Sequence, residues 1–148
     1  HMEQVGLNVA EFLAYLGIAL LGLGLSGSAI GLSIAGSAVT GMADERRNQG
    51  IVVSVLPGTQ GLYSFAVGFL CLQELAQDEP RFLIVFAAGL VTGLACLLSG
   101  WYQGIVCAAG IKSINQGRMT VGQALLLAVF PEFYAILGFA LSALLLFQ

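Results

Sequence analysis

Charged side chains are scarce in this chain. Lys, Arg, Asp and Glu make up 9% of its 148 residues and hydrophobic residues 58%, whereas a soluble globular domain carries roughly 25% charge. The composition therefore excludes a soluble globular protein and indicates a membrane protein. The formal net charge of −3 offers no basic surface to a nucleic acid, so no nucleic-acid partner is expected.

Histidine and cysteine are also scarce. The only histidine is His1, and the three cysteines, Cys71, Cys96 and Cys107, show no CxxC spacing. Metal centres built from imidazole or thiolate need clusters of these residues. We interpret the cysteines as packing residues within apolar helices.

Long uncharged runs fill most of the chain. Four of them reach the length of about 20 residues that a membrane-spanning helix needs, namely residues 12–43, 51–72, 82–111 and 120–147. They predict an all-α membrane protein with four transmembrane helices in a single membrane domain, residues 1–148. Of the five basic and eight acidic residues, only Glu132 falls in the middle of a run.

The charges between the runs predict an orientation. Arg46 and Arg47 lie in the first connection, and Lys112 and Arg118 flank the third, whereas the second, "QELAQDEPR", is acidic apart from Arg81. Cytoplasmic loops carry an excess of Lys and Arg. We therefore expect the first and third loops in the cytoplasm and both termini outside.

The two halves of the chain resemble each other. "LSGSAIGLSIA" from Leu25 aligns with "LSGWYQGIVCA" from Leu98, and "PGTQGLYSFA" from Pro57 aligns with "PEFYAILGFA" from Pro131. Such self-similarity indicates a duplication. It predicts two parallel helical hairpins, residues 9–76 and 80–148, in which the position of Glu132 corresponds to Gly58.

Small residues recur at four-residue spacing in the first helix of each hairpin. The stripes are Gly27–Gly31–Ala35, Ala29–Ser33–Ser37–Gly41, Gly89–Gly93 and Gly100–Gly104–Ala108. Such stripes let helix backbones approach closely in lipid. Several stripes on one helix favour crowding on more than one side, as in a closed ring of identical subunits, with the bulkier second and fourth helices outside. Ordinary packing within a four-helix bundle is the alternative.

Polar side chains interrupt the hydrocarbon at one depth. Thr59, Gln60 and Tyr63 share one helix face. Counting about 1.5 Å per residue from the flanking charges puts them at a depth similar to that of Gln103 and Glu132. We expect these groups to converge in the middle of the membrane. Each also has a structural interpretation, such as a hydrogen bond across helices or to its own helix.

Placing an ionised carboxylate in a bilayer costs free energy, so an ionisable residue at such a depth is expected to have a function. A bound cation or a proton would neutralise Glu132. Ligands that are all oxygen favour a hard cation, and one carboxylate balances one positive charge, so Na⁺ is the predicted ligand and H⁺ the alternative. Pro57 and Pro131 each remove a backbone N–H near these residues, which predicts a bend in the outer helices or a kink without function.

The stretches "LPGTQGLY", "SGWYQGIVCAAGI" and "PEFYAILGF" resemble the proteolipid subunit of V-type rotary ATPases, in particular its bacterial sodium-translocating branch. The resemblance covers nearly the whole chain and departs from the family pattern at Pro131 and Phe133. It implies a set of ion ligands, with a tyrosine that supports the glutamate. These residues are the Leu56 backbone carbonyl, Thr59, Gln60, Gln103 and Glu132, with Tyr63 as the supporting tyrosine.

The resemblance also implies the setting in which such a site works. Identical subunits would form a rotor ring in the bacterial plasma membrane. A separate stator subunit would contribute an arginine, and central-stalk subunits would contact the cytoplasmic loops "ADERRNQG" and "NQGRM". ATP hydrolysis would take place in a soluble head. No catalytic site is expected in this chain, which has no phosphate loop.

Three alternatives stay open at this point. The same rotor protein could carry H⁺ instead of Na⁺. A small four-helix cation antiporter built around Glu132 is more distant, because it leaves the duplication and the small-residue stripes unexplained. A purely structural membrane bundle is the third.

Overall fold

The computed structural model describes residues 2–148, and their side chains from residue 9 onward. Helices make up nearly all of this part of the chain. In order, the elements are α1 (Met2–Val39), a 3₁₀ turn (Asp44–Arg46), α2 (Arg47–Ser54), a second 3₁₀ turn (Leu56–Gly58), α3 (Thr59–Leu75), α4 (Phe82–Asn115) and α5 (Val121–Leu146). No strand occurs within residues 2–148, so the predicted all-α class is confirmed.

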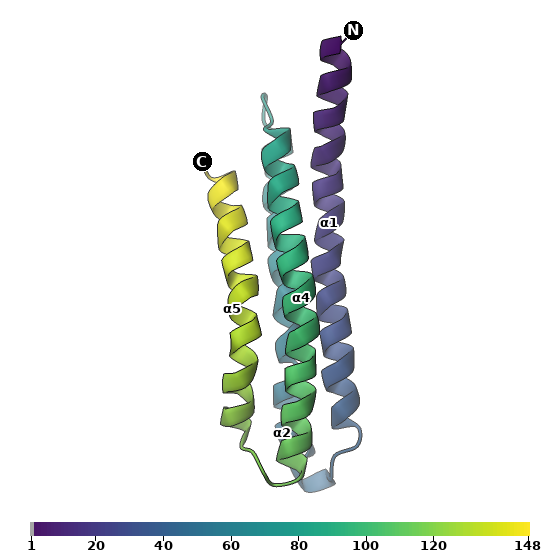
Figure 1. Ribbon diagram of the computed structural model, residues 1–148, viewed down its shortest axis with the longest axis vertical. Helices are drawn as coiled ribbons and strands as arrows, with labels where there is room; N and C mark the ends of the chain where they lie inside the picture. The colour runs from purple at the N-terminus through teal and green to yellow at the C-terminus, as the bar shows by residue number, and fades with distance from the viewer. Residues whose placement is uncertain (1) are drawn as a thin grey trace.

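The helices run alongside one another in an elongated bundle (Figure 1). α1 and α4 lie side by side, and α5 flanks α4. The start of α1, the α3–α4 connection and the end of α5 lie towards one end of the bundle. The α1–α2 and α4–α5 connections lie at the opposite end.

Four helical segments are long and apolar enough to cross a membrane, as the uncharged runs predict. They are Val9–Val39, Asp44–Leu75, Phe82–Asn115 and Val121–Leu146. The number of spans is confirmed, whereas most bounds of the helices differ from those of the uncharged runs. The first helix ends at Val39 and not at residue 43, and the second segment begins at Asp44 and not at residue 51.

The second segment begins with charged residues, and one of them, Arg46, is tied to the end of another helix. Its guanidinium donates hydrogen bonds to the carbonyl oxygens of Ile114 (2.7 Å) and Asn115 (3.3 Å) at the end of α4. These carbonyls have no partner within their own helix. An absence of charge marks the residues that lipid tolerates, whereas a charged side chain bonded to a helix end, as Arg46 is, can lie within a helical segment.

The third connection is closed by specific caps. After α4 the chain turns at Gly117, whose φ of 72° is a conformation that glycine adopts without strain. Gly117 N–H donates to Ile114 O, and Arg118 N–H donates to Ser113 O, which is the Schellman arrangement. Thr120 then forms a capping box with Gln123 at the start of α5. The helix therefore begins one residue after the predicted start of the fourth run.

Glycines bring the backbones of α1 and α4 into contact. A Cβ atom added at Gly31 would collide with the carbonyl oxygen of Gly100, and one added at Gly104 would collide with the backbone of Gly31. A Cβ at Gly27 would meet the backbone of Cys96 and Leu97 in the same way. The stripe that contains Gly27 and Gly31 is therefore used within the chain.

The other small-residue stripe of α1 has no neighbour of this kind. Ala29, Ser33, Ser37 and Gly41 are exposed, and a Cβ added at Gly41 would meet nothing within 4 Å among the described atoms. Large apolar side chains, by contrast, project from the outer faces of α3 and α5. They include Leu62, Phe65, Phe69, Phe130, Phe133, Leu137 and Leu144.

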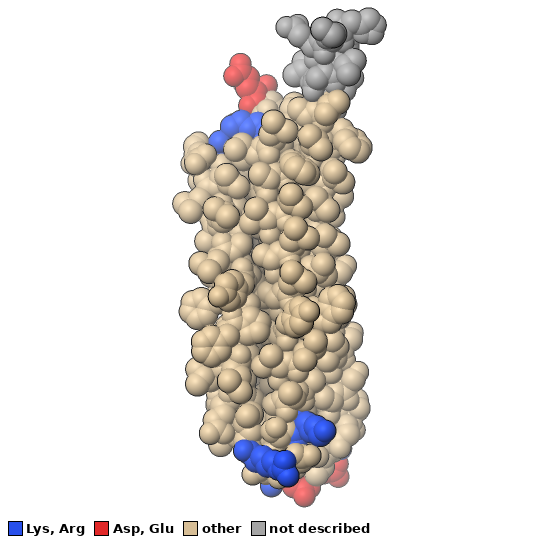
Figure 2. Space-filling model, in the orientation of Figure 1, with Lys and Arg blue, Asp and Glu red and all other residues tan. Residues whose placement is uncertain are grey.

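Charge is confined to the two ends of the bundle on the face shown in Figure 2, with a long uncharged surface between them. In water so much exposed apolar surface would be a liability. Its uniform lack of charge, on helices long enough to cross a membrane, instead matches the hydrocarbon core of a bilayer.

Candidate functional site

Five of the polar side chains singled out in the sequence meet where α3, α4 and α5 adjoin. Thr59, Gln60 and Tyr63 come from the start of α3, Gln103 from α4, and Glu132 from the middle of α5. Gln60 and Gln103 are fully buried, and Glu132 is 8% exposed. Within the part of the chain whose side chains are described, Glu132 is the only buried residue that carries a formal charge.

The carboxylate of Glu132 accepts hydrogen bonds from all four of the others. Its Oε1 atom accepts from the hydroxyls of Thr59 (2.6 Å) and Tyr63 (2.8 Å). Its Oε2 atom accepts from Gln103 Nε2 (2.8 Å) and, at greater length, from Gln60 Nε2 (3.4 Å), with Thr59 Oγ1 also at 2.8 Å. A buried carboxylate requires this degree of compensation, because each unpaired polar atom in hydrocarbon costs several kcal/mol.

The two amides are bonded to each other as well. Gln60 Nε2 donates to Gln103 Oε1 (2.7 Å), while Gln103 Nε2 also donates to the carbonyl oxygen of Ala128 (2.9 Å) on α5. The oxygen of Gln60 lies 3.3 Å from Thr59 Oγ1. The cluster thus holds five side-chain oxygens from the two amides, the threonine hydroxyl and the carboxylate of Glu132.

The break in the second segment explains why α3 begins at the site. α2 ends at Ser54, and a 3₁₀ turn through Pro57 precedes α3, which begins at Thr59. The helix is interrupted at Pro57, as expected from its missing N–H, whereas α5 continues through Pro131. The amino-terminal end of α3, which carries a positive partial charge, therefore lies beside the carboxylate of Glu132.

Leu56 lies in that 3₁₀ turn. Its carbonyl oxygen accepts from the backbone N–H of Thr59 and lies 3.4 Å from the Thr59 hydroxyl. The backbone carbonyl is thus one turn from the carboxylate cluster, next to a residue that contacts it. That Leu56, Thr59, Gln60, Gln103 and Glu132 bind an ion stays a prediction.

Two serines also contact the residues of this cluster, and neither was predicted from the sequence. Ser99 on α4 contacts Gln60 and Pro131, and Ser28 on α1 accepts the backbone N–H of Gly61 at 2.7 Å. Ser99 lies four residues before Gln103, and therefore on the same helix face, which is a signal that was present. Ser28 carried no signal of its own among the many small residues of α1.

Three aromatic residues close in sequence to Gln103 and Glu132 lie apart from the carboxylate. Phe133 follows Glu132 in α5 but is 53% exposed, so its ring points to the surroundings of the bundle. Trp101 and Tyr102 are also exposed, with ring centroids 6.3 Å apart. None of the three has a hydrogen bond to the cluster among the described residues.

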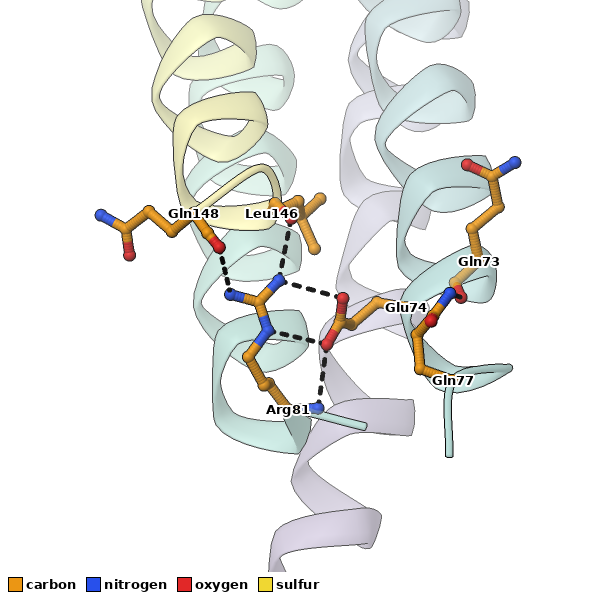
Figure 3. Close-up of polar contacts among 6 residues, drawn as sticks. All are labelled: Gln73, Glu74, Gln77, Arg81, Leu146 and Gln148. Carbon is orange, nitrogen blue, oxygen red and sulfur yellow. Dashed lines mark hydrogen bonds and ion pairs between the residues drawn. The ribbon is translucent and has the colours of Figure 1, made fainter. Parts of the chain in front are cut away.

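A second polar cluster lies at the end of the bundle where α3, α4 and α5 come together (Figure 3). Arg81 donates to both carboxylate oxygens of Glu74 (2.8 and 3.0 Å) and to the carbonyl oxygen of Leu146 (2.8 Å) at the end of α5. The hydrogen bonds with Glu74 raise the pKa of the Arg81 guanidinium above its ordinary value. This ion pair joins three helix ends and is remote in sequence from Glu132.

The arrangement at Glu132 is suited to holding a small positive ion. It offers one carboxylate and neutral oxygens in a fully apolar bundle, and hard cations prefer such ligands. The fold and the site together define a class of membrane protein in which a buried helix-borne carboxylate serves as an ion-binding site.

Comparison with known proteins identifies the family within this class. The profile of the family described as the C subunit of ATP synthase matches residues 86–145. The chain is 37% identical over 126 residues to the K subunit of the V-type sodium ATPase of Enterococcus hirae, covering 84% of this chain and 77% of that protein. It is 39% identical over 148 residues to the K subunit of the A-type ATP synthase of Methanocaldococcus jannaschii, covering 98% of this chain and 61% of that protein.

A human relative extends the comparison to proton pumps. The 16 kDa proteolipid of the human V-type proton ATPase is 29% identical over 150 residues, which cover 97% of this chain and 96% of that protein. The chain belongs to the proteolipid family of V/A-type ATPases, as its sequence motifs predicted. It is a multi-pass integral membrane protein and a non-catalytic, ion-translocating rotor subunit.

Proposed function

We propose that this chain is the building block of a V-type ATPase rotor ring that binds Na⁺ in the membrane and moves it across as the ring turns. The ligands in this proposal are the carboxylate of Glu132, the side-chain oxygens of Gln103, Gln60 and Thr59, and the backbone carbonyl of Leu56. Tyr63 holds the carboxylate in place. The ATP hydrolysis that drives rotation takes place in the soluble head of the complex.

One observation supports Na⁺ over H⁺. The side-chain amides of Gln60 and Gln103, which are fully buried and come from different helices, flank the carboxylate of Glu132. A protonated glutamate is already neutral and has little need of amide oxygens. A bare Na⁺ ion instead needs several oxygens to replace its water. The relative of Enterococcus hirae is named as part of a sodium ATPase, whereas the human relative is named as part of a proton ATPase.

The ring is proposed from the surfaces of the single chain together with the family. The exposed small-residue face of α1 allows close approach of a neighbouring copy, and the bulky outer faces of α3 and α5 suit lipid. In this arrangement α1 and α4 lie inside and α3 and α5 outside. The two hairpins, residues 9–76 and 80–148, are then duplicated units that occupy successive places around the ring.

The charge distribution supports an orientation for this ring. Arg46, Arg47 and Lys112 belong to the end that carries the α1–α2 and α4–α5 connections, and positive loops stay in the cytoplasm. Central-stalk subunits then contact these two connections, and both termini lie outside the bacterial plasma membrane.

Transport follows from the neutralisation of Glu132. With Na⁺ bound, the site carries no net charge and can face lipid while the ring rotates. An arginine of the separate stator favours the ionised carboxylate and so releases Na⁺ on the far side. The duplication adds a consequence, because Gly58 stands where the first hairpin would carry its own carboxylate.

With one carboxylate for four helices, fewer ions move per turn. Moving one charge across 100 mV takes about 2.3 kcal/mol. When fewer ions move per turn, a larger share of the free energy of ATP hydrolysis is available to move each ion. This favours ion pumping over ATP synthesis. Counting the ions moved per ATP in reconstituted vesicles tests this step.

Carbodiimide labelling of Glu132 tests the proposed ligand. The reagent modifies the protonated carboxyl group, so a bound cation protects it. We expect Na⁺ to slow the labelling of the detergent-purified assembly, and K⁺ at the same concentration to leave it unchanged. Because protons compete for the same carboxylate, more Na⁺ is needed as the pH falls. Labelling that is indifferent to Na⁺ would instead identify a proton-carrying rotor.

A further inference from the structure

The hydroxyl of Ser99 joins the three helices that build the ion site. We propose that Ser99 is a positioning residue, which fixes the amide of Gln60 so that its oxygen rather than its nitrogen faces the bound ion. The proposal rests on the Na⁺ site proposed above. It adds a residue that does not touch the carboxylate but determines how well the site binds a cation.

The direction of the Ser99 hydroxyl is set by the backbone of α5. Ser99 Oγ donates to the carbonyl oxygen of Pro131 at 2.7 Å, and it lies 3.1 Å from Gln60 Nε2. A serine hydroxyl has one proton and otherwise accepts. Because that proton is committed to Pro131, Ser99 presents only lone pairs to Gln60 and selects its N–H group.

The second hydrogen of the Gln60 amide is also committed. Gln60 Nε2 donates to Gln103 Oε1 at 2.7 Å, while its contact with Glu132 is longer, at 3.4 Å. An amide nitrogen carries two hydrogens, so the two shorter contacts, with Ser99 and Gln103, account for both of them, and Glu132 Oε2 only shares one. A reversed amide would turn its oxygen towards the lone pairs of these same two acceptors, which is electrostatically unfavourable.

The oxygen of Gln60 is consequently directed to the other edge of the cluster. It lies 3.3 Å from Thr59 Oγ1, and Thr59 itself contacts both carboxylate oxygens of Glu132. A chain of hydrogen bonds therefore links the carbonyl oxygen of Pro131, the hydroxyl of Ser99 and the amide of Gln60. It ends with the neutral oxygen of Gln60 beside the hydroxyl of Thr59, which itself contacts the carboxylate.

The equivalent serine of the first hairpin behaves differently. Ser26, 73 residues before Ser99 in the repeat, is exposed and donates to the carbonyl oxygen of Gly22 in its own helix at 2.8 Å. That bond is the common one for serine within a helix. Ser99 is 5% exposed and bonds to two other helices instead, on the hairpin that carries Glu132.

The test compares Ser99→Ala with Ser99→Thr in the detergent-purified assembly. Two quantities are measured by carbodiimide labelling of Glu132: the Na⁺ concentration that gives half protection, and the pH dependence of labelling without Na⁺. Ser99→Ala is expected to raise the Na⁺ concentration about 5- to 10-fold, the effect of losing one hydrogen bond. The pH dependence without Na⁺ stays unchanged, because Ser99 does not contact the carboxylate. Ser99→Thr keeps the hydroxyl and stays within about twofold of the unaltered protein.

Ser142 provides a matched control. Its hydroxyl also joins α4 and α5, through the carbonyl oxygen of Ala88 (2.9 Å) and the hydroxyl of Thr92 (2.7 Å), but has no contact with Glu132 among the described residues. Ser142→Ala is expected to lower thermal stability as Ser99→Ala does, and to leave the Na⁺ requirement unchanged. If Ser99→Ala does not assemble, Ser99→Cys takes its place, because the thiol has a similar shape and is a weak donor and acceptor.

The outcomes separate this proposal from the one on which it rests. If Na⁺ fails to protect the unaltered protein, both proposals are overturned. If Na⁺ protects the unaltered protein and Ser99→Ala equally well, only the role of Ser99 is overturned. Equal shifts in Ser99→Ala and Ser142→Ala, or a Ser99→Thr variant as weak as Ser99→Ala, also overturn it by showing a merely structural effect.

Discussion

The hydroxyl of Tyr63 donates a hydrogen bond of 2.8 Å to Oε1 of Glu132. The bond links α3 to α5 at the one buried carboxylate of the described residues. It leaves Oε2 to the amide groups of Gln103 and Gln60. The carboxylate is therefore held by hydroxyls on one oxygen and by amides on the other, with Thr59 bridging the two.

Removal of this phenol should weaken ion binding without disturbing the fold. In Tyr63→Phe the ring still packs against Phe139, but Oε1 of Glu132 loses a donor, and hydrogen bonds to charged groups are the stronger ones. We expect about tenfold more Na⁺ for half protection of Glu132 from carbodiimide. Tyr134→Phe is the control, since Tyr134 is exposed and has no hydrogen bond to the cluster among the described residues. An unchanged Na⁺ requirement in Tyr63→Phe would contradict the supporting role.

Glu132 itself should be required for transport but not for assembly. In Glu132→Gln the side chain keeps its shape and an oxygen, so the contacts with Thr59 and Gln103 can persist. Without the negative charge, nothing balances a bound cation. We expect loss of both carbodiimide labelling and ATP-driven Na⁺ uptake into vesicles. Glu79→Gln, in the exposed α3–α4 connection, should retain both. Na⁺ uptake by the Glu132→Gln variant would exclude the proposed site.

The sequence predicted the family and the four apolar helices, because both depend on features that are local in the chain. Uncharged length decides which segments lipid accepts, and the motifs around Gln60, Gln103 and Glu132 carry the family resemblance. The helices do not end where the uncharged runs end: α1 stops at Val39, and the second segment includes charged residues from Asp44 on, among them Arg46, which bonds to a distant helix end. No charge count contains that information.

The four side chains that the structure gathers around the carboxylate of Glu132 are ones that the sequence had named. Charged and amide groups in an apolar run are conspicuous, whereas Ser28 and Ser99 are not. A serine in a helix usually bonds to its own backbone, as Ser26 does. Whether a serine bonds to another helix instead depends on which groups lie opposite it across the helix interface. That information comes only from the three-dimensional packing.

The glycine contact between α1 and α4 should tolerate no added carbon. A Cβ at Gly100 would fall within 3 Å of the backbone of Gly27, and overpacking of this kind costs about 1–3 kcal/mol. We expect Gly100→Ala to lower the thermal midpoint of the purified assembly. The control is Gly122→Ala near the start of α5, where the nearest atom would be Thr120 Oγ1 at 4.0 Å. Equal stability of the two variants would contradict the packing described.

The ion pair between Arg81 and Glu74 should stabilise the end of the bundle and have no part in ion binding. Arg81→Ala removes the bidentate contact with Glu74 and the bond to the carbonyl oxygen of Leu146. A solvent-exposed pair of this kind contributes little to stability. We expect a small fall in thermal stability, greater at low salt where screening is weak. The Na⁺ requirement of Glu132 labelling should not change, and a change would mean that this end of the bundle is coupled to the site.

Ser64 should respond to alanine in the opposite direction from Ser142, although both are buried serines. Apart from the thiol of Cys96, a weak hydrogen-bonding group, the hydroxyl oxygen of Ser64 has no partner among the described residues, whereas that of Ser142 is bonded to Ala88 and Thr92. Burying an unpaired hydroxyl costs about 1–3 kcal/mol, and replacing it with an apolar group avoids that cost. Ser64→Ala is therefore expected to be neutral or to raise the thermal midpoint, while Ser142→Ala lowers it. A fall in stability of similar size in both variants would mean that the Ser64 hydroxyl is paired in the membrane, by a neighbouring copy of the chain or by water.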